Sequence, residues 1–137
     1  MECWAATLHY STAPTTAMQI HLLKSKLHCA RVTEANVNYE GSLTIAEDLM
    51  EKVGLFPYER ILCSNMVNGE RFETYAIPGK RGSGAIILNG ATAHLGKVGD
   101  PLTIMSYTEV DAAKATGWQP RVIVLDEKNL IVNERGI

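Results

Sequence analysis

Short runs of apolar and polar residues, separated by turn-forming residues, make up most of the chain after Met18. The segment Leu27–Val37 mixes Val, Thr and small residues in partial alternation, which is typical of a half-buried strand. Many short strands joined by tight turns favour a small, mainly β fold, a β-barrel with one or two short helices. Further strands are predicted at Ala85–Leu88, Leu102–Tyr107, Arg121–Leu125 and Leu130–Val132.

The clearest local pattern is a hairpin centred on Asn68-Gly69. The strand-like runs Arg60–Val67 and Glu70–Ile77 flank this pair, and both of its residues tolerate a positive φ. The next segment, Pro78–Gly84, is rich in residues that break regular structure. We therefore predict a flexible, solvated turn there, rather than an anion-binding loop.

Two short helices are predicted. Residues 44–47, Thr-Ile-Ala-Glu, have the spacing of a capping box with Thr44 as the N-cap, and Gly54 is the predicted stop. The second helix is predicted over Thr108–Thr116, before Gly117. In the first helix, the apolar residues that share one face and should contact the core are Leu49, Met50 and Val53.

Composition narrows the choice of function. The chain has 137 residues, enough for one domain, with 46% hydrophobic and 20% charged residues and a net charge of -2. This balance offers no general attraction to nucleic acids or to anionic membranes. Cys3, Cys29 and Cys63 form no C-x-x-C pair, which favours reduced thiols in a cytoplasmic protein over a zinc site or a disulfide framework.

The first 17 residues differ in character from the rest. They carry one charged residue, Glu2, and lack both the basic start of a secretory signal and the arginines of a transit peptide. We predict a poorly ordered extension over residues 1–17, with Met18 as an alternative start, and a single domain over residues 18–137. No apolar run is long enough to cross a bilayer.

The common catalytic motifs are absent from the sequence. It contains no G-x-G-x-x-G, no P-loop and no G-x-S-x-G elbow. Aromatic residues make up only 7%, which disfavours binding of single-stranded nucleic acid. No metal site is expected, because no H-x-x-x-H spacing relates the four histidines, His9, His21, His28 and His94.

Three segments carry the functional information jointly: Tyr39–Ser42, Asn68–Tyr75 and Asn89–His94, with Lys26-Leu27-His28 upstream. Taken alone, the Tyr-Glu-Gly-Ser segment predicts only a turn. In their order and spacing, however, the segments resemble the pyruvoyl-dependent aspartate 1-decarboxylase family. The resemblance runs from Met18 to about Tyr107, and more loosely to the C-terminus.

The resemblance implies a double-psi β-barrel that assembles as a homotetramer in the cytoplasm. It implies that the precursor cuts itself between Gly41 and Ser42 and converts Ser42 into a pyruvoyl group, with no pyridoxal phosphate and no metal. The implied reaction turns L-aspartate into β-alanine and carbon dioxide for pantothenate synthesis. Whether the cut is spontaneous or needs a maturation partner stays open.

The residue types suit this chemistry. Loss of an α-carboxylate leaves a carbanion, and the pyruvoyl group supplies the electron sink that stabilises it. To form that group, Ser42 Oγ attacks the carbonyl of Gly41, the resulting ester eliminates to dehydroalanine, and hydrolysis releases ammonia. Glycine at position 41 leaves the attack unobstructed and permits a strained φ.

Family roles carry over by matching positions. Thr74 matches the threonine that stabilises the oxyanion during processing, and Tyr75 matches the tyrosine that returns a proton after carbon dioxide leaves. Arg71 and Lys26 match the two cations that face the acidic groups of the substrate. The loop matched to substrate binding comprises Asn89, Gly90, Ala91 and Thr92, and Tyr39 and His28 have weaker claims to a supporting role.

One feature of the predicted strand conflicts with a site built within one chain. Arg71 and Tyr75 are four residues apart and share a face, whereas Thr74 points to the opposite face in a regular strand. The conflict is resolved if the site lies between subunits, or if the strand ends at Glu73. Both alternatives are compatible with the sequence.

Two positions depart from the family pattern. Thr92 replaces an alanine found in many members, which adds a hydroxyl and bulk, and Ser64 stands where some relatives carry tryptophan. Both changes bear on substrate fit more than on the reaction. Two rival functions remain compatible with the sequence: an uncleaved β-barrel that only binds a partner, and the same chemistry on another acidic amino acid such as glutamate.

Overall fold

The computed structural model describes residues 17–137, and this part of the chain is mainly β. It contains nine strands, one α-helix and two 3-10 turns, which confirms the predicted fold class. The predicted extension falls, apart from Ala17, outside the described residues. The elements are β1 (Gln19–Arg31), β2 (Glu34–Asn36), β3 (Ser42–Ala46), α2 (Glu47–Val53), β4 (Arg60–Asn65), β5 (Arg71–Gly79), β6 (Ile86–Asn89), η1 (Gly90–His94), β7 (Pro101–Asp111), η2 (Ala112–Lys114), β8 (Arg121–Leu125) and β9 (Ile131–Arg135).

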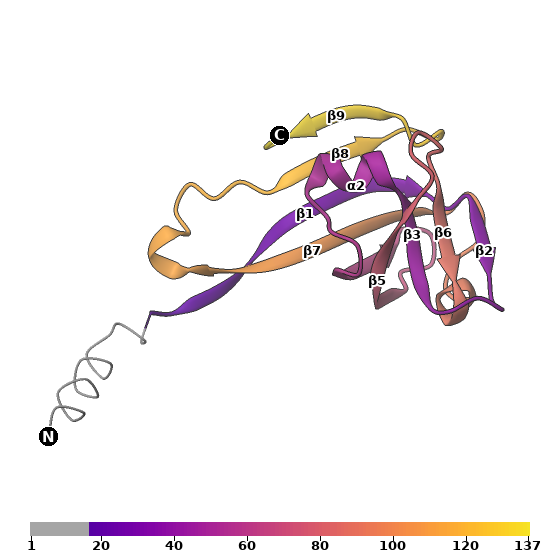
Figure 1. The fold of residues 1–137 in the computed structure, drawn as a ribbon, viewed down its shortest axis with the longest axis horizontal. Helices are drawn as coiled ribbons and strands as arrows, with labels where there is room; N and C mark the ends of the chain where they lie inside the picture. The colour runs from indigo at the N-terminus through magenta and orange to yellow at the C-terminus, as the bar shows by residue number, and fades with distance from the viewer. Residues whose placement is uncertain (1–16) are drawn as a thin grey trace, which may run out of the picture.

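The strands form one continuous, strongly curved sheet in the order β2-β6-β3-β5-β4-β7-β1-β8-β9 (Figure 1). Three of the neighbouring pairs are parallel, namely β1 with β8, β2 with β6 and β3 with β5, and the others are antiparallel. β3 therefore lies between β5 and β6, in the middle of one half of the sheet. Within residues 17–137, no helix is both long and apolar enough to span a membrane.

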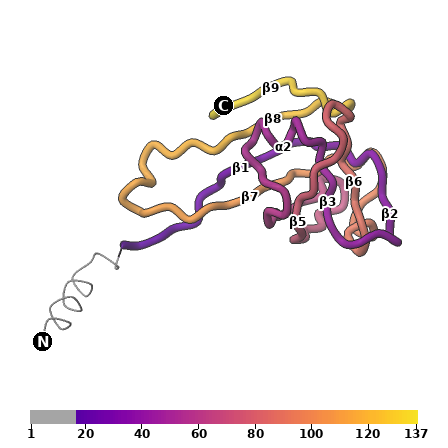
Figure 2. The backbone as a smooth tube through the Cα atoms, viewed as in Figure 1, coloured from indigo at the N-terminus to yellow at the C-terminus, as the bar shows by residue number. Residues whose placement is uncertain are grey.

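A long two-stranded arm extends from the compact body. It is the outer part of the β1–β7 pair, in which Gln19 pairs with Asp111 and Leu23 with Tyr107 (Figure 2). The single strand predicted over Leu27–Val37 is wrong in its bounds: pairing with β7 extends β1 back to Gln19, β1 ends at Arg31, and β2 is a separate strand that pairs with β6. β7 is longer than the sequence predicts. The predicted helix over Thr108–Thr116 is wrong, because pairing with β1 extends β7 to Asp111 and leaves only the short turn η2.

The predicted hairpin is confirmed, with a longer connection than two residues. β4 ends at Asn65 and β5 begins at Arg71. Gly69 has a φ of +75° and its N–H donates to the Asn65 carbonyl at 2.9 Å, so only one residue of the Asn-Gly pair uses the left-handed region. The register then places Ser64 opposite Arg71.

The predicted helix is confirmed in its position and in its end, but not in its start. Gly54 caps α2 with a φ of +74°, and Leu49, Met50 and Val53 are buried as expected. The predicted capping box is wrong: Ala46 is the N-cap residue, no side chain caps the helix, and Thr44 lies inside β3. Thr44 extends the strand because its backbone pairs with β6, where it faces Ile87.

The core fills the inside of the curved sheet. It is built from one face of each strand together with the apolar face of α2, as the burial of Leu43, Ile45 and Ala76 illustrates. The loop after β5 closes over this helix, since Arg81 bonds to Glu47 and Glu51. The predicted solvated turn is thus anchored to α2 by ion pairs.

Two of the three cysteines lie in the described residues, and both are free thiols. Cys63 is fully buried, and this burial raises the pKa of its thiol to about 12. We therefore expect Cys63 to escape iodoacetamide at pH 8 in the native protein and to be alkylated in guanidinium, because the thiolate is the reactive form. Peptide mapping by mass spectrometry measures this, and equal labelling in the two states would contradict it.

Candidate active site

The turn before β3 is packed against a glycine of η1. Gly90 has a φ of +67°, and a Cβ built on it would lie 2.7 Å from Gly41 Cα and 2.8 Å from the Tyr39 carbonyl oxygen. Only glycine fits this contact between two backbones. The Gly90 of the predicted substrate loop therefore supports the Tyr39–Gly41 turn directly.

Ser42 is the first residue of β3 and is almost fully buried, at 1% exposure. It pairs in the antiparallel ladder with Asn89, the last residue of β6, which is also buried. Asn89 Nδ2 donates to Ser42 Oγ at 3.0 Å, and Ser42 Oγ approaches the Glu40 carbonyl oxygen at 3.4 Å. The hydroxyl next to the Gly41–Ser42 bond is thus held by an amide donor in a site screened from solvent.

The same amide has a second partner. Asn89 Nδ2 donates to Thr44 Oγ1 at 2.9 Å. Because side chains in a strand alternate, Ser42 and Thr44 project on the same face of β3, and Asn89 lies between their hydroxyls. The sequence spacing predicts Thr44 as a helix cap and so misses its place beside Asn89. Alternation along a strand that starts at Ser42 is the pattern that indicates it.

Thr92 contacts the backbone of both Asn89 and Ser42. It is buried, and its hydroxyl donates to the Asn89 carbonyl at 2.8 Å and lies 3.5 Å from the carbonyl oxygen of Ser42. The Thr92 hydroxyl is therefore satisfied by the backbone of the site. Ala91 is exposed beside it.

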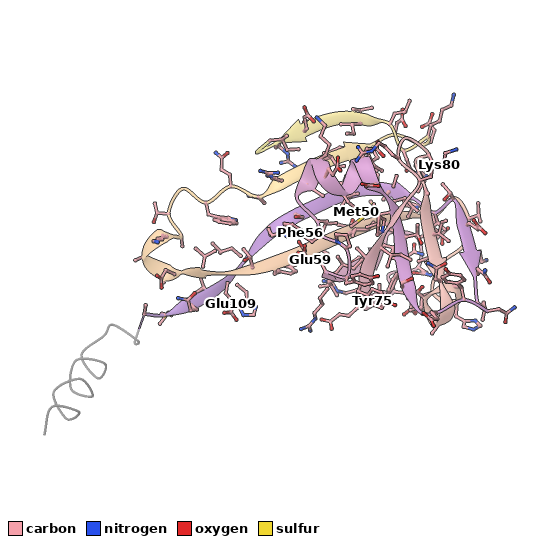
Figure 3. All side chains as sticks on the ribbon, in the orientation of Figure 1. Met50, Phe56, Glu59, Tyr75, Lys80 and Glu109 are labelled. Atoms are coloured by element: carbon pink, nitrogen blue, oxygen red, sulfur yellow. The ribbon has the colours of Figure 1, made fainter. Side chains whose placement is uncertain are left out.

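β5 brings Tyr75 next to Ser42. Leu43 pairs with Ala76 in the parallel ladder, so Ser42 and Tyr75, each one residue earlier, are level on the same face. The Tyr75 ring lies 6.2 Å from the ring of Tyr58, centre to centre. Figure 3 shows Tyr75 in the body of the molecule, well separated from Glu109 on the arm.

The alternation predicted along β5 is confirmed. The strand runs through to Gly79, so the alternative that it ends at Glu73 is wrong. Arg71 is exposed on the outward face of the sheet. Thr74 pairs with Ile61 and points to the opposite face. Thr74 lies two residues before Ala76, which pairs with Leu43 of β3.

The two predicted cations are on the outward face but not together. Arg71 donates to Ser64 Oγ at 2.8 Å, in the row of the sheet that β4 and β5 share. Lys26 pairs with Met105 on β7, and β1 is three strands away from β5. Three strand spacings correspond to about 14 Å between the backbones. His28, two residues after Lys26, is half-buried on the same face of β1.

Arg71 and Lys26 differ from nearby basic residues in whether they form ion pairs. Arg60 pairs with Glu73, and Lys24 pairs with Glu59, both at 2.8 Å. Within the described part of the chain, neither Arg71 nor Lys26 forms an ion pair. The two positions matched to substrate carboxylates therefore keep their positive charge uncompensated within residues 17–137.

A cavity of about 380 Å³ opens on the outward face of β4, β5 and β7. It includes Leu62, Glu73 and Met105 in its lining, but neither Ser42 nor Tyr75. Among residues 17–137, no group of three or more His, Cys, Asp or Glu is placed to hold a metal ion. The groups around Ser42 are side-chain hydroxyls, the side-chain amide of Asn89 and backbone atoms.

The loop after η1 is fixed by a carboxylate. Asp100 accepts hydrogen bonds from Asn65 Nδ2 and the Lys97 N–H, each at 2.9 Å, and the bond from Asn65 contributes most to lowering the pKa of Asp100. Asn65 also donates to the Leu95 carbonyl at 3.1 Å. These bonds tie the end of the Asn89–His94 segment to β4.

Fold and site together define a small, mainly β enzyme domain whose central feature is a buried serine at the start of a strand, after an exposed glycine. The sequence model of the aspartate decarboxylase family matches residues 18–132, and the chain belongs to this family. It is therefore a carboxy-lyase, and its curved sheet is consistent with the β-barrel of that family.

Curated relatives are similar over most of their length. An aspartate 1-decarboxylase of Syntrophobacter fumaroxidans is 53% identical over 82% of this chain and 90% of its own. One from Thermoanaerobacter pseudethanolicus is 50% identical over 85% of this chain and 99% of its own. One from Shouchella clausii is 52% identical over 84% and 91%.

The contact between Gly90 and the 39–41 turn can be tested by stability. We expect Gly90→Ala to lower the free energy of unfolding by about 2–4 kcal/mol, because the new Cβ meets rigid backbone and the left-handed φ is strained. Gly69→Ala is the matched control: its φ is also positive, but nothing lies within 4 Å of the added Cβ. Urea titration measures both, and equal losses would contradict the contact.

Proposed function

We propose that this chain is a self-processing, pyruvoyl-dependent decarboxylase that converts L-aspartate into β-alanine and carbon dioxide. The observation that carries the proposal is the setting of Ser42, a buried hydroxyl held by Asn89 at the start of β3, directly after Gly41. The names of the curated relatives support L-aspartate as the substrate. By resemblance to the family, the product would feed pantothenate synthesis in the cytoplasm.

Processing would begin with attack of Ser42 Oγ on the carbonyl carbon of Gly41. The C–N bond of the peptide breaks and an ester forms, while the proton of the hydroxyl passes to the freed amine. Loss of the Ser42 α-proton then breaks the Cβ–Oγ bond, which releases the carboxylate of Gly41 and leaves dehydroalanine. Addition of water and loss of ammonia give the pyruvoyl group at position 42.

The surrounding residues fit these steps. Asn89 Nδ2 faces Oγ and can stabilise negative charge on that oxygen as it leaves. By resemblance to the family, Thr74 would serve the carbonyl oxygen under attack. Close packing of the turn on Gly90 limits the motions of the bond to be cut.

The chain contains a second Gly-Ser bond, Gly82–Ser83, with which Gly41–Ser42 can be compared. Ser83 follows Gly82 in the loop after β5, where it is exposed, and its hydroxyl donates to the Lys80 carbonyl at 2.6 Å. The two dipeptides are identical, but only Ser42 is buried beside an amide donor. We therefore assign cleavage to Gly41–Ser42 and not to Gly82–Ser83.

Once formed, the pyruvoyl ketone would supply the electron sink for decarboxylation. Tyr75, level with residue 42 on the same face, would donate the proton that replaces the lost carboxylate. Arg71 and Lys26 would bind the acidic groups of the substrate, since both are free of ion pairs in the part of the chain described here. Asn89, Gly90, Ala91 and Thr92 would line the site, with His28 and Tyr39 around it.

The separation of Lys26 from Arg71 supports a site shared between copies. Their backbones are about 14 Å apart in one sheet, so both cations could contact one aspartate only with their side chains extended toward each other. We place the active site between subunits of a homotetramer, each with a single domain over residues 18–137, with maturation either spontaneous or assisted by a partner. Thr92 and Ser64 would tune the fit of the substrate.

Intact mass spectrometry under denaturing conditions tests the cut. We expect two chains that join at Gly41–Ser42, the larger one lighter by one ammonia than a chain that starts with serine. Ser42→Ala should stay at full length and be inactive, whereas the matched variant Ser83→Ala should be cut and active. A full-length wild-type chain that persists on warming would favour the rival that only binds a partner. Decarboxylation by Ser42→Ala would overturn the pyruvoyl chemistry proposed at Ser42.

Substrate choice is a separate test. We expect kcat/KM for aspartate to exceed that for glutamate by about 10–200-fold, because one extra methylene displaces the second carboxylate from its cation. Carbon dioxide release measures both reactions under identical conditions. Equal values, or a preference for glutamate, would replace aspartate as the substrate and leave the self-processing chemistry in place.

A further inference from the structure

Thr44 lies next to the processing site without touching the bond to be cut. It shares a face of β3 with Ser42, and both hydroxyls face the side chain of Asn89 from the neighbouring strand. The distances from Asn89 Nδ2 are 3.0 Å to Ser42 Oγ and 2.9 Å to Thr44 Oγ1. The amide therefore joins two hydroxyls of one strand.

The number of hydrogens on Asn89 Nδ2 determines which groups donate and which accept in this bridge. A carboxamide NH2 has two hydrogens and no acceptor site, so each hydrogen of Asn89 Nδ2 points to one of the two hydroxyls. Asn89 is 4% exposed, and a buried N–H without a partner is costly. If Thr44 offered no acceptor, rotation of the amide would relieve this cost and turn Oδ1, which cannot donate, toward Ser42.

We propose that Thr44 is a positioning residue for self-processing: its hydroxyl holds the Asn89 amide with Nδ2 toward Ser42 Oγ. The inference rests on the proposed function. The hydrogen bond matters most when the Cβ–Oγ bond breaks, because negative charge then develops on the departing oxygen and needs a donor. Thr44 acts on that oxygen only through Asn89.

The methyl group of Thr44 has a different neighbour. A Cβ built on Gly79 would lie 2.8 Å from Thr44 Cγ2, so the methyl packs over the end of β5. The side chain thus divides into a hydroxyl directed at Asn89 and a methyl directed at Gly79. Two pairs of proteins separate them: wild type against Thr44→Val, which both keep that methyl, and Thr44→Ser against Thr44→Ala, which both lack it.

The experiment follows cleavage at Gly41–Ser42 over time by intact mass. We expect Thr44→Val to be cut about 3- to 10-fold more slowly than wild type, and Thr44→Ala more slowly than Thr44→Ser by a similar factor, as loss of one hydrogen bond predicts. Thr44→Ser should keep close to the wild-type rate. Melting temperatures identify any variant that does not fold, and the other pair then decides.

Hydroxylamine gives a second measurement that a purely structural role would not change. It cuts an accumulated ester to leave residues 42–137 starting with serine. We expect this product to rise in Thr44→Val and Thr44→Ala, because the step that releases the Gly41 carboxylate is the one slowed. A wild-type chain that is never cut would overturn the proposed function and the role of Thr44 with it. Normal cleavage in folded Thr44→Val or Thr44→Ala, or no rise in the ester, would overturn the role of Thr44 alone.

Discussion

The register between β3 and β6 is the constraint on which the site depends. It sets Ser42 opposite Asn89. Because strand side chains alternate, this one pairing decides that Ser42, Thr44 and Asn89 meet on a single face, while Leu43 and Ile45 fill the core. A shift by one residue would bury the hydroxyls among apolar side chains and turn the core residues toward the site. The apolar packing of β3 thereby fixes the position of its polar groups.

The same alternation places the side chains of β5 on two faces of the sheet. Phe72 and Ala76 are buried, whereas Arg71 and Tyr75 face outward, and the parallel pairing with β3 brings Tyr75 level with Ser42. Thr74 necessarily points the other way. One strand thus presents Tyr75 on the face that Ser42 shares and Thr74 on the opposite face of the sheet.

The sequence allowed most of the fold to be predicted, because the short apolar runs and their turns are local features. β8 was predicted at its exact bounds, and the buried face of α2 was correct. The errors arose where a distant strand changed a local preference. Pairing with β1 turned residues 108–111 into strand, and pairing with β6 did the same for Thr44. The site residues came from resemblance to a family, and the hydroxyl–amide–hydroxyl bridge could not be predicted, since it depends on a register set 45 residues away.

The position of β1 has a consequence for the life of the protein. β1 lies between β7 and β8, hydrogen-bonded to both, although it precedes Gly41 in the chain. A cut after Gly41 would leave it in place as a separate peptide woven through the sheet. Folding would then have been unimolecular when the chain was made, but reassembly after denaturation would need two molecules to meet and would depend on concentration. The mature enzyme would then persist because the peptide that carries β1 and β2 escapes slowly, which is a kinetic and not an equilibrium form of stability.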